Sequence, residues 1–392
     1  MESALGWVRK RIGPDFSLLP AIFLALDFKQ ICDAQSDESK YGSILGISDK
    51  EAKKFVLFFN RVGFRPARDE RHSLNFRLRI VDETFLRKLV VRIERRSGLI
   101  EICIQREVIE SGLFNEMLSR LLIVMRNYGH GIGNILNVQS GIDQDASLYL
   151  NLGDGGNEYD VEITSEMNFY AFARRKNERE IGLIPDSFTL FDIENEVNFA
   201  VVTDKQVASE EYRTRSKSIF WRGATTGRAF GSEALANPRI AFCQATLSLH
   251  PLVDAKITKV VQFKNGKKVQ RELKRLGLMS RMVEESEFSR HMAYIDLDGN
   301  STAWGTFRKY LQVVHVIKPL SEFSMFYHLL EPADAFTSIR GTSHLIEKLK
   351  NDENFANNFE VAWNGYQFAL GVRDKIRSGE ATIFPSSREA KG

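Results

Sequence analysis

The sequence predicts an α/β protein of two Rossmann-like domains facing a central cleft, preceded by an N-terminal α+β extension. Three observations lead to this fold class. The length of 392 residues exceeds the size at which a single hydrophobic core stops growing. From residue 146 onward, short apolar strands alternate with helical stretches, a pattern typical of βα units on a parallel sheet. The charged segment Asp204–Lys217 divides these units into two series, with the boundary between Val202 and Ser216.

The composition indicates a soluble, well-packed protein without a strong overall charge. Hydrophobic residues make up 43% of the chain and charged residues 27%, as in ordinary globular proteins. The 54 basic and 51 acidic residues nearly balance, which argues against a nucleic-acid partner. The three cysteines are widely separated, so neither a disulfide framework nor structural zinc is expected.

The apolar run Leu18–Leu26 is interrupted by Pro20 and is too short to span a bilayer. Basic residues before it imitate a signal peptide, but no clear cleavage site follows. We therefore expect a cytoplasmic protein. A peripheral membrane contact through this basic and apolar terminus stays open.

Before residue 140 the pattern predicts a helix, a small sheet and a second helix. Ser48 and Glu51 form a capping box for a helix that reaches Val62. Apolar residues alternate with polar ones over 74–80 and again over 100–104, which predicts a small antiparallel meander with an Arg-rich outer face.

A helical stripe runs from Leu113 to Val124, and the glycine-rich segment Gly129–Gly133 is expected to form a loop after it. This loop lacks the full phosphate-binding fingerprint, and no clear strand precedes it.

Two series of βα units follow. Ligands of such sheets lie at the carboxyl ends of the strands, so this edge is the expected binding site. The expected strands are 147–152, 169–173, 188–191, 218–221, 292–297 and 313–317, and the expected helices begin at Asn237, Trp304 and Glu322 and again beyond Asp352.

The first segment with chemical character, Ile219–Arg228, is a strand that runs into glycines, hydroxyls and arginine, with Arg239 in the next helix. Backbone N–H groups at such a strand-to-helix turn bind anions, and arginine supplies paired donors, so a diphosphate would fit. The alternative is a capped turn with solvated arginines.

The second segment, Ala293–Lys309, repeats this design. Asp296 and Asp298 at the end of its strand invite a metal interpretation, because carboxylates suit hard cations. Capping of backbone N–H groups or bonding of sugar hydroxyls is the stronger alternative for such a pair.

Several segments together resemble glycosyltransferase family 90, which includes capsule xylosyltransferases, protein O-glucosyltransferases and bacterial lipopolysaccharide-modifying enzymes. The resemblance spans roughly residues 146 to 340 and keeps the order of the motifs. It is carried by Trp221-Arg222-Gly223, Thr226-Gly227, Arg239, Asp254, the segment Asp296–Trp304, Glu322-Phe323, Phe326-Tyr327, Leu330 and Pro332.

The resemblance implies a GT-B fold, a UDP-sugar donor with glucose or xylose as its sugar, inversion at the anomeric carbon and no metal or other cofactor. The acceptor would be a hydroxyl of a polysaccharide, a lipopolysaccharide or another lipid-linked glycan. Asp154 matches the family's catalytic base, which takes the acceptor proton, and the alternative is a turn-forming Asp-Gly at a strand end. Asp160 and Asp186 are the next candidates for the base. The expected donor-binding residues are Arg222, Gly223, Thr225, Thr226, Arg228, Arg239, Asp296, Asp298, Ser301, Thr302, Trp304, Arg308 and Glu322.

These expectations divide the chain into four parts. Residues 1–140 form the N-terminal extension, 141–210 together with parts of the N-terminal region form the Rossmann-like acceptor and base half, 211–345 form the donor-binding Rossmann-like domain, and 346–392 form C-terminal helices that pack back.

The sequence also departs from the family pattern. Thr225 stands where the O-glucosyltransferases have an arginine, with Arg228 as the substitute, and Arg308 is offset along its helix. Ala333–Phe336 replaces the usual aromatic segment, which indicates a changed acceptor or a lost activity.

Two other functions stay open. One is a glycan- or nucleotide-binding module without turnover. The other is polyanion binding through the Arg-rich strands, although a solvated strand face explains those side chains more simply. These are Arg77, Arg79, Arg87, Arg92, Arg95 and Arg96.

Overall fold

The computed structural model confirms the α/β class. It describes residues 76–81, 89–96, 99–110, 113–140, 145–153, 168–195, 204–227, 236–352 and 354–378. The expected helix at 48–62 and the basic, apolar terminus lie outside these residues. Within the described ranges, none of the helices has the length and apolar content that crossing a bilayer requires.

The chain divides into two compact units. Unit 1 comprises 1–172, 177–190 and 376–392, and unit 2 comprises 173–176 and 191–375. The segment expected to link two domains forms helix α8 (Lys205–Arg213) inside unit 2, because Asp204 caps it by accepting from the backbone N–H groups of Gln206 and Val207.

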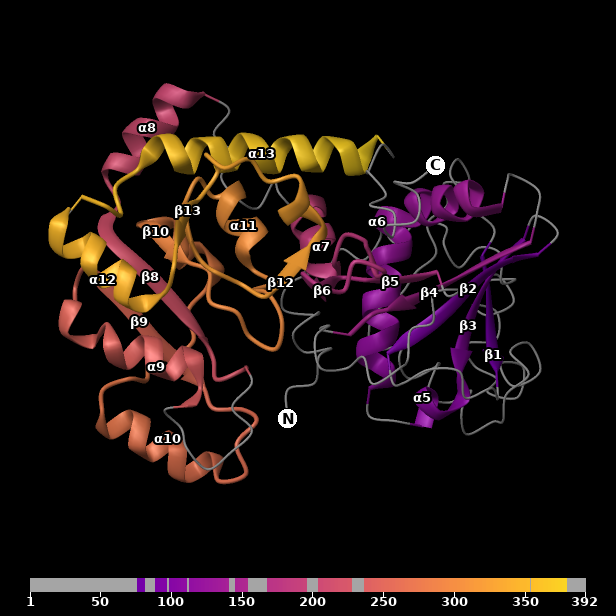
Figure 1. Ribbon diagram of the computed structural model, residues 1–392, viewed down its shortest axis with the longest axis horizontal. Coiled ribbons are helices and arrows are strands. Elements are labelled where there is room, and N and C mark those ends of the chain that lie inside the picture. Colours follow the sequence, from indigo (N-terminus) through magenta and orange to yellow (C-terminus); the bar gives the residue numbers. More distant parts are fainter. Residues whose placement is uncertain are drawn as a thin grey trace, which may run out of the picture. The chain divides into compact units, whose positions relative to one another are not determined.

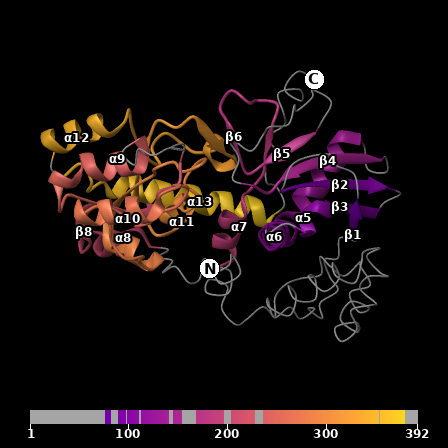
Figure 2. The same ribbon diagram turned by 90° about the horizontal axis from the view of Figure 1, so that it is seen from below.

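Unit 1 is built on a six-stranded mixed sheet in the order β1-β3-β2-β4-β5-β7. Figure 2 shows its first four strands side by side. The strands are β1 (Phe76–Val81), β2 (Val90–Arg96), β3 (Leu99–Gln105), β4 (Ala146–Asn151), β5 (Phe169–Ala171) and β7 (Gly182–Leu183).

The strand pairing in this sheet differs from the expected antiparallel meander. β1 and β3 are parallel, and β2 lies antiparallel between β3 and β4. The early strands β1, β2 and β3 therefore share one sheet with β4 and β5, which were expected in the acceptor half. Strand pairing is decided by long-range packing, which alternation within one strand does not encode.

Two arginines of the expected solvated face have partners within the protein. The Arg95 side chain is buried and donates to the Leu136 carbonyl at 3.3 Å. Arg92 forms an ion pair with Glu94 at 2.6 Å. These two guanidinium groups are engaged inside unit 1, which weakens the polyanion hypothesis.

The glycine-rich segment Gly129–Gly133 is helical. It lies within α6 (Phe114–Ser140), which packs against β4. The apolar period continues through the glycines, because Ile132, Ile135 and Leu136 are all buried. Packing of this stripe outweighs the low helix propensity of glycine, so the predicted loop is wrong.

The expected strand 188–191 is also wrong, since these residues belong to helix α7 (Ser187–Glu194). Asp186 caps the helix: its Oδ1 accepts from the N–H groups of Phe188 and Thr189, and its Oδ2 accepts from the Thr189 hydroxyl. A short apolar run does not distinguish a buried helix from a strand.

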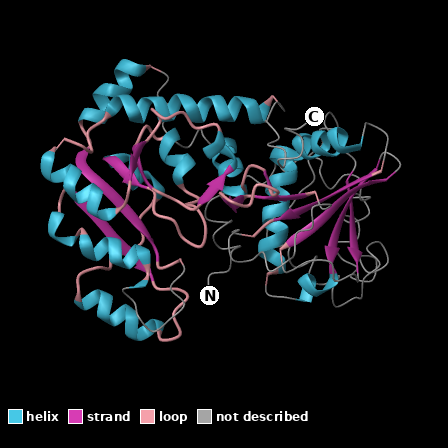
Figure 3. Cartoon of the chain, viewed as in Figure 1, coloured by secondary structure: helices cyan, strands magenta, loops and turns pink. Residues whose placement is uncertain are grey.

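Unit 2 has a five-stranded parallel sheet in the order β13-β11-β10-β8-β9. Helices alternate with its strands, as in a Rossmann-like domain (Figures 1 and 3). The strands are β8 (Ser216–Ala224), β9 (Val253–Lys259), β10 (His291–Ile295), β11 (His315–Pro319) and β13 (Thr337–Ile339).

Of the helices expected in unit 2, those that begin after Asn237, Trp304 and Asp352 are present, and helices at 266–275 and 342–351 were not predicted. Glu322 begins no helix: β12 (Phe323–Met325) pairs antiparallel with β6 (Ala173–Arg175), and the 3-10 helix Phe326–Leu329 follows. The others are α9 (Pro238–Ala245), α10 (Gly266–Arg275), α11 (Thr306–Leu311), α12 (Thr342–Asn351), α13 (Phe359–Arg377) and the 3-10 helices Leu247–Leu249 and Glu285–Arg290; α5 (Arg106–Glu110) belongs to unit 1.

Helix α13 is part of the unit 2 core up to Lys375. Its residues Ala362, Trp363 and Tyr366 form one buried cluster with Tyr212 of α8 and with Met292, Ala208 and Val313. The C-terminal segment thus completes the same core that the parallel sheet begins.

Candidate functional site

The carboxyl ends of the parallel strands in unit 2 bring several polar loops together. β8 runs into Thr225–Gly227, β9 into Val260–Gln262, β10 into Asp296–Thr302 and β11 into Leu320–Glu322. Parallel strands end at the same edge, which is the usual ligand site of such sheets. These four loops form the strand-end site of unit 2.

The loop after β8 is held to the loop after β9. The buried Thr225 hydroxyl donates to the Val261 carbonyl at 2.9 Å, and the Val261 N–H donates to the same hydroxyl at 2.8 Å. The Gly227 N–H donates to Gln262 Oε1 and to Asn300 Oδ1, both at 3.2 Å. Gly227 has a φ of 131°, which only glycine adopts readily.

The loop continues to α9, whose N-cap is Asn237. The side-chain Oδ1 of Asn237 accepts from the N–H groups of Arg239 and Ile240, and its side-chain Nδ2 donates to the Thr225 carbonyl at 3.1 Å. The N-terminus of α9 is therefore tied to the strand-end site, as the sequence predicts.

Arg239 ties the loops after β8 and β10 together. Its Nε donates to the Asp298 carbonyl at 2.8 Å and its Nη2 to the Leu297 carbonyl at 2.7 Å. Its Nη1 donates to the Ala224 carbonyl at 3.1 Å and to the Thr226 hydroxyl at 2.5 Å. Arg239 places a fixed positive charge between the two loops.

The backbone at Gly299 lies close to the side chains of Thr226 and Arg239. A Cβ atom at this position would lie 2.7 Å from the Thr226 hydroxyl and 3.0 Å from Arg239 Nη2. Any larger residue must displace the guanidinium or the hydroxyl.

Asp296 and Asp298, expected in the donor site, both lie at the end of β10. The Ser321 hydroxyl donates to Asp298 Oδ2 at 2.6 Å. Asp296 is buried, and Lys318 Nζ, which forms an ion pair with Glu331 at 2.8 Å, is 3.9 Å from Asp296 Oδ2. Asp296 Oδ1 has no hydrogen-bond partner of normal geometry among the described residues.

Burial sets the charge state of this carboxyl. It raises the pKa of Asp296 to about 7; Lys318 opposes the rise and Asp298 adds to it. Burial also raises the pKa of Asp298, and the Ser321 hydrogen bond and Arg239 oppose that rise. Asp296 therefore titrates near neutral pH at the strand-end site.

Ser301, Thr302 and Trp304 follow the two aspartates, after the end of β10. Ser301 and Thr302 are buried, and the Trp304 indole N–H donates to the Ser301 hydroxyl at 3.2 Å. Within the described ranges, no three His, Cys, Asp or Glu side chains lie together as a metal ligand set.

Arg222 lies on β8 rather than in the loop. Its Nη2 contacts Asp254 Oδ2 at 2.8 Å, and its Nη1 donates to the Asp254 carbonyl at 2.8 Å. The guanidinium also lies over the Phe220 ring, 4.2 Å from its centroid. The following residue, Gly223, has the Trp221 ring where a Cβ would be.

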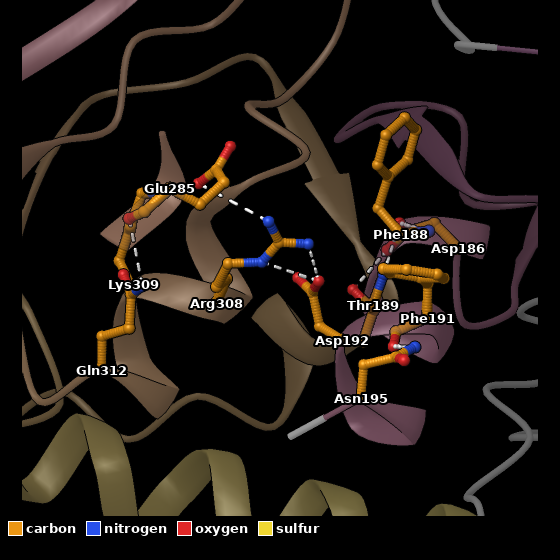
Figure 4. A network of polar contacts seen from close by, with 10 residues as sticks. All are labelled: Asp186, Phe188, Thr189, Phe191, Asp192, Asn195, Glu285, Arg308, Lys309 and Gln312. Atoms are coloured by element: carbon orange, nitrogen blue, oxygen red, sulfur yellow. Dashed lines mark hydrogen bonds and ion pairs between the residues drawn. The ribbon is translucent and has the colours of Figure 1, made fainter. Parts of the chain in front are cut away.

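Arg308, expected as a phosphate ligand, contacts the carboxylates of Asp192 and Glu285. Its guanidinium is buried and bonds Asp192 of α7 through Nε and Nη2. Glu285 lies on its other side, 3.6 Å from Nη1, and accepts from Lys309 at 2.5 Å (Figure 4). Carboxylates thus lie on both sides of the Arg308 guanidinium.

Glu322 is exposed, and its carbonyl accepts from the Lys176 N–H at 2.8 Å. Asp154 and Arg228 lie outside the described residues, as does Asp160, the first substitute for Asp154 as the base. Asp186, the other substitute, is buried with both carboxylate oxygens bonded by the start of α7, which makes it a helix cap rather than a base.

Sequence reasoning missed Gln262, Asn300 and Ser321, although each follows the end of a parallel strand or lies in the loop after one. A rule that takes every polar side chain after a strand of the sheet would have found them. Lys318 and Glu331 give no such signal, because their pairing joins separate segments.

No protein-family model matches the chain, and no curated protein matches it. A solved structure of the C-terminal domain of a glycosyl transferase group 1 family protein (LpcC) from Francisella tularensis matches with 12% identity and a TM-score of 0.30, over 45% of this chain and 96% of that one. WaaG, a glycosyltransferase involved in lipopolysaccharide biosynthesis, matches with 12% identity and a TM-score of 0.26, over 46% of this chain and 50% of that one.

An S. aureus MnaA-UDP structure matches with 10% identity and a TM-score of 0.29, over 52% of this chain and 55% of that one. This chain thus spans about half the length of WaaG and MnaA. The identities and scores are too low to carry an argument about function, which must rest on the chain's own residues.

Proposed function

We propose that the protein is a glycosyltransferase of the GT-B type that transfers a sugar from a UDP-sugar to a glycan hydroxyl, with inversion and without a metal. The support is the Arg239 bridge. The residues that carry the family 90 resemblance after β8 and after β10 belong to loops joined by one guanidinium.

In this proposal the strand-end site binds the donor. The α9 N-terminus and the charge of Arg239 stabilise the diphosphate, and Arg228 supplies a further cation. Stabilising the departing diphosphate is the largest contribution that such a site makes to a displacement. Ser301, Thr302 and Asp298 offer oxygen atoms to the sugar or ribose hydroxyls.

The base in this proposal is Asp154, on the ground of its motif alone. It takes the proton of the acceptor hydroxyl while the new bond to the anomeric carbon forms. The acceptor is a polysaccharide, a lipopolysaccharide or another lipid-linked glycan, and the donor sugar is glucose or xylose.

Donor binding is tested by thermal unfolding with UDP, UDP-glucose, UDP-xylose and, as a control, GDP, each with and without EDTA. A ligand at 100 times its Kd stabilises the native state by about 2.7 kcal/mol, so a clear rise in melting temperature is expected for the UDP compounds. The rise should survive EDTA. A rise that requires added Mg²⁺ or Mn²⁺ contradicts the metal-free donor site.

The base is tested with Asp154→Asn, which keeps the shape of the side chain and removes the proton acceptor. Transfer should fall by ~100-fold or more, while UDP affinity stays at the parent value. An Asn variant that transfers sugar at the parent rate removes Asp154 from this role.

A nucleotide- or glycan-binding module without turnover is the second candidate function. It is favoured by Arg308, because the arginine that the family pattern suggests for the diphosphate is engaged with Asp192 instead. Slow hydrolysis of a UDP-sugar without acceptor separates the two, since a transferase produces free sugar and UDP and a pure binding module does not.

A further inference from the structure

Helix α10 carries the densest positive charge among the described helices. Five of its ten residues are Lys or Arg, and Glu272 is its one acidic residue. Lys264 stands just before the helix. We call these six side chains the α10 basic face: Lys264, Lys267, Lys268, Arg271, Lys274 and Arg275.

The basic face lies opposite the face that holds the helix to unit 2. Successive residues of a helix are rotated by about 100°, which puts the five helical cations within an arc of about 120°. Val269 and Leu273 lie on the other side and are 4% and 0% exposed. All six cations are exposed, and α10 is the outermost helix at the lower end of unit 2 in Figure 1.

No acidic side chain of the described residues forms an ion pair with any of the six. Cations on other helices behave differently: Lys205 pairs with Glu360 at 2.7 Å and Lys309 with Glu285 at 2.5 Å. The net charge of the whole chain is only +3. The α10 basic face is therefore a local concentration of uncompensated charge on a nearly balanced protein.

We propose that the α10 basic face docks the protein on an anionic phospholipid membrane. Clusters of four to eight Lys and Arg on one helix are the usual means of adhesion to such surfaces, and each contributes roughly a five-fold gain in binding. Ten helical residues span about 15 Å, so the exposed row of cations can contact headgroups along the length of the helix.

A nucleic acid is a poorer fit to the same face. Proteins that hold single strands stack the bases on aromatic side chains, and residues 264–275 contain none. The outer face also has no large apolar side chain, so α10 adheres to headgroups without inserting. Its binding must then weaken strongly with salt.

The test is co-sedimentation of the full chain with vesicles of phosphatidylcholine containing phosphatidylglycerol, and with pure phosphatidylcholine vesicles. Binding is expected only to the anionic vesicles, and raising NaCl to about 0.5 M should remove most of it, because the Debye length becomes shorter than the spacing of the charges. The Lys268→Gln/Arg271→Gln/Arg275→Gln variant should bind on the order of 100-fold more weakly.

The matched control, Arg213→Gln/Lys348→Gln/Lys350→Gln, changes the net charge equally at three exposed positions on α8 and α12. It should keep the parent affinity, and both variants should melt near the parent temperature. The proposal is overturned if the α10 variant binds like the parent, if the control loses as much, if neutral vesicles bind equally, or if a single-stranded oligonucleotide binds more tightly than the vesicles. None of these outcomes depends on UDP binding.

Discussion

Arg239 and Arg308 occupy similar places in the sequence and different places in the molecule. Each lies in the first turn of a helix that follows a strand of the same parallel sheet. Arg239 bonds the loops at the strand ends, whereas Arg308 is buried between Asp192 and Glu285.

The helices explain the difference. All six residues of α11 are buried, so its cations must find partners inside unit 2. In α9 only Ile240, Phe242 and Cys243 are buried, and Arg239 can turn toward the loops. An arginine after a strand indicates a ligand only when its helix exposes that turn. From this comparison we predict that replacing Arg308 lowers stability, and that replacing Arg239 weakens binding of the proposed donor.

The largest expected effect is the loss of stability on replacing Arg308. Arg308→Met leaves the Asp192 carboxylate buried without its guanidinium, which should lower the free energy of unfolding by about 3–5 kcal/mol. Urea denaturation measures this loss. Adding Asp192→Leu should restore most of it, because a buried ion pair and an apolar pair are of similar stability. If the double variant is no more stable than Arg308→Met, the pair is not what Arg308 stabilises.

The next largest effect is a pH dependence of the free energy of unfolding, which comes from Asp296 in the strand-end site. The native state keeps the Asp296 proton up to a pKa of about 7, whereas the unfolded chain releases it near pH 4. The native state thus binds more protons between these values, and its stability should fall as pH rises from 4 to 7, by about 3 kcal/mol from this group. Asp296→Asn should remove that part of the slope. Equal slopes in both proteins would contradict the assignment.

On the Arg239 side the main effect should be on affinity. Arg239→Gln removes the charge that joins the two loops, and UDP affinity should fall by about 2–3 kcal/mol, as expected for charged hydrogen bonds. Isothermal titration with UDP measures it. Arg308→Met, tested under conditions where it is folded, should bind UDP like the parent protein. The reverse result would exchange the roles of the two arginines.

The smallest expected effect comes from adding one methyl group at Gly299. Gly299→Ala brings a Cβ against Thr226 and Arg239 and should weaken UDP binding by about 1 kcal/mol through displaced side chains. Gly305→Ala is the matched control, because a Cβ there meets nothing within 4 Å. Equal UDP affinities for both variants would show that the close approach at Gly299 does not matter for the ligand.

Local patterns predicted much of unit 2. Strands β8, β10 and β11 and the helix that begins after Asn237 lie where alternation and capping place them. The strand-end rule also located the loops at Thr225–Gly227 and Asp296–Thr302. These features depend on neighbouring residues, so one sequence contains the necessary information.

The predictions that failed concern features that depend on residues far apart in the sequence. The helix through Gly129–Gly133 is stabilised by packing, and the parallel pairing of β1 with β3 is a tertiary choice. The partner of Arg308 lies 116 residues away in the sequence. No pattern within a window of ten or twenty residues can show that Asp192 will neutralise Arg308.

The buried cluster that joins α8 to α13 also constrains the order in which unit 2 is made. The Tyr212 hydroxyl donates to the Met292 carbonyl at 2.9 Å and lies 3.4 Å from the Ala356 carbonyl, 144 residues later in the chain. A chain emerging from the ribosome exposes the apolar side chains of this cluster until Ala362, Trp363 and Tyr366 have been synthesised. Nascent chains that stop before Phe359 should therefore bind chaperones that recognise apolar segments, and release should coincide with the emergence of α13.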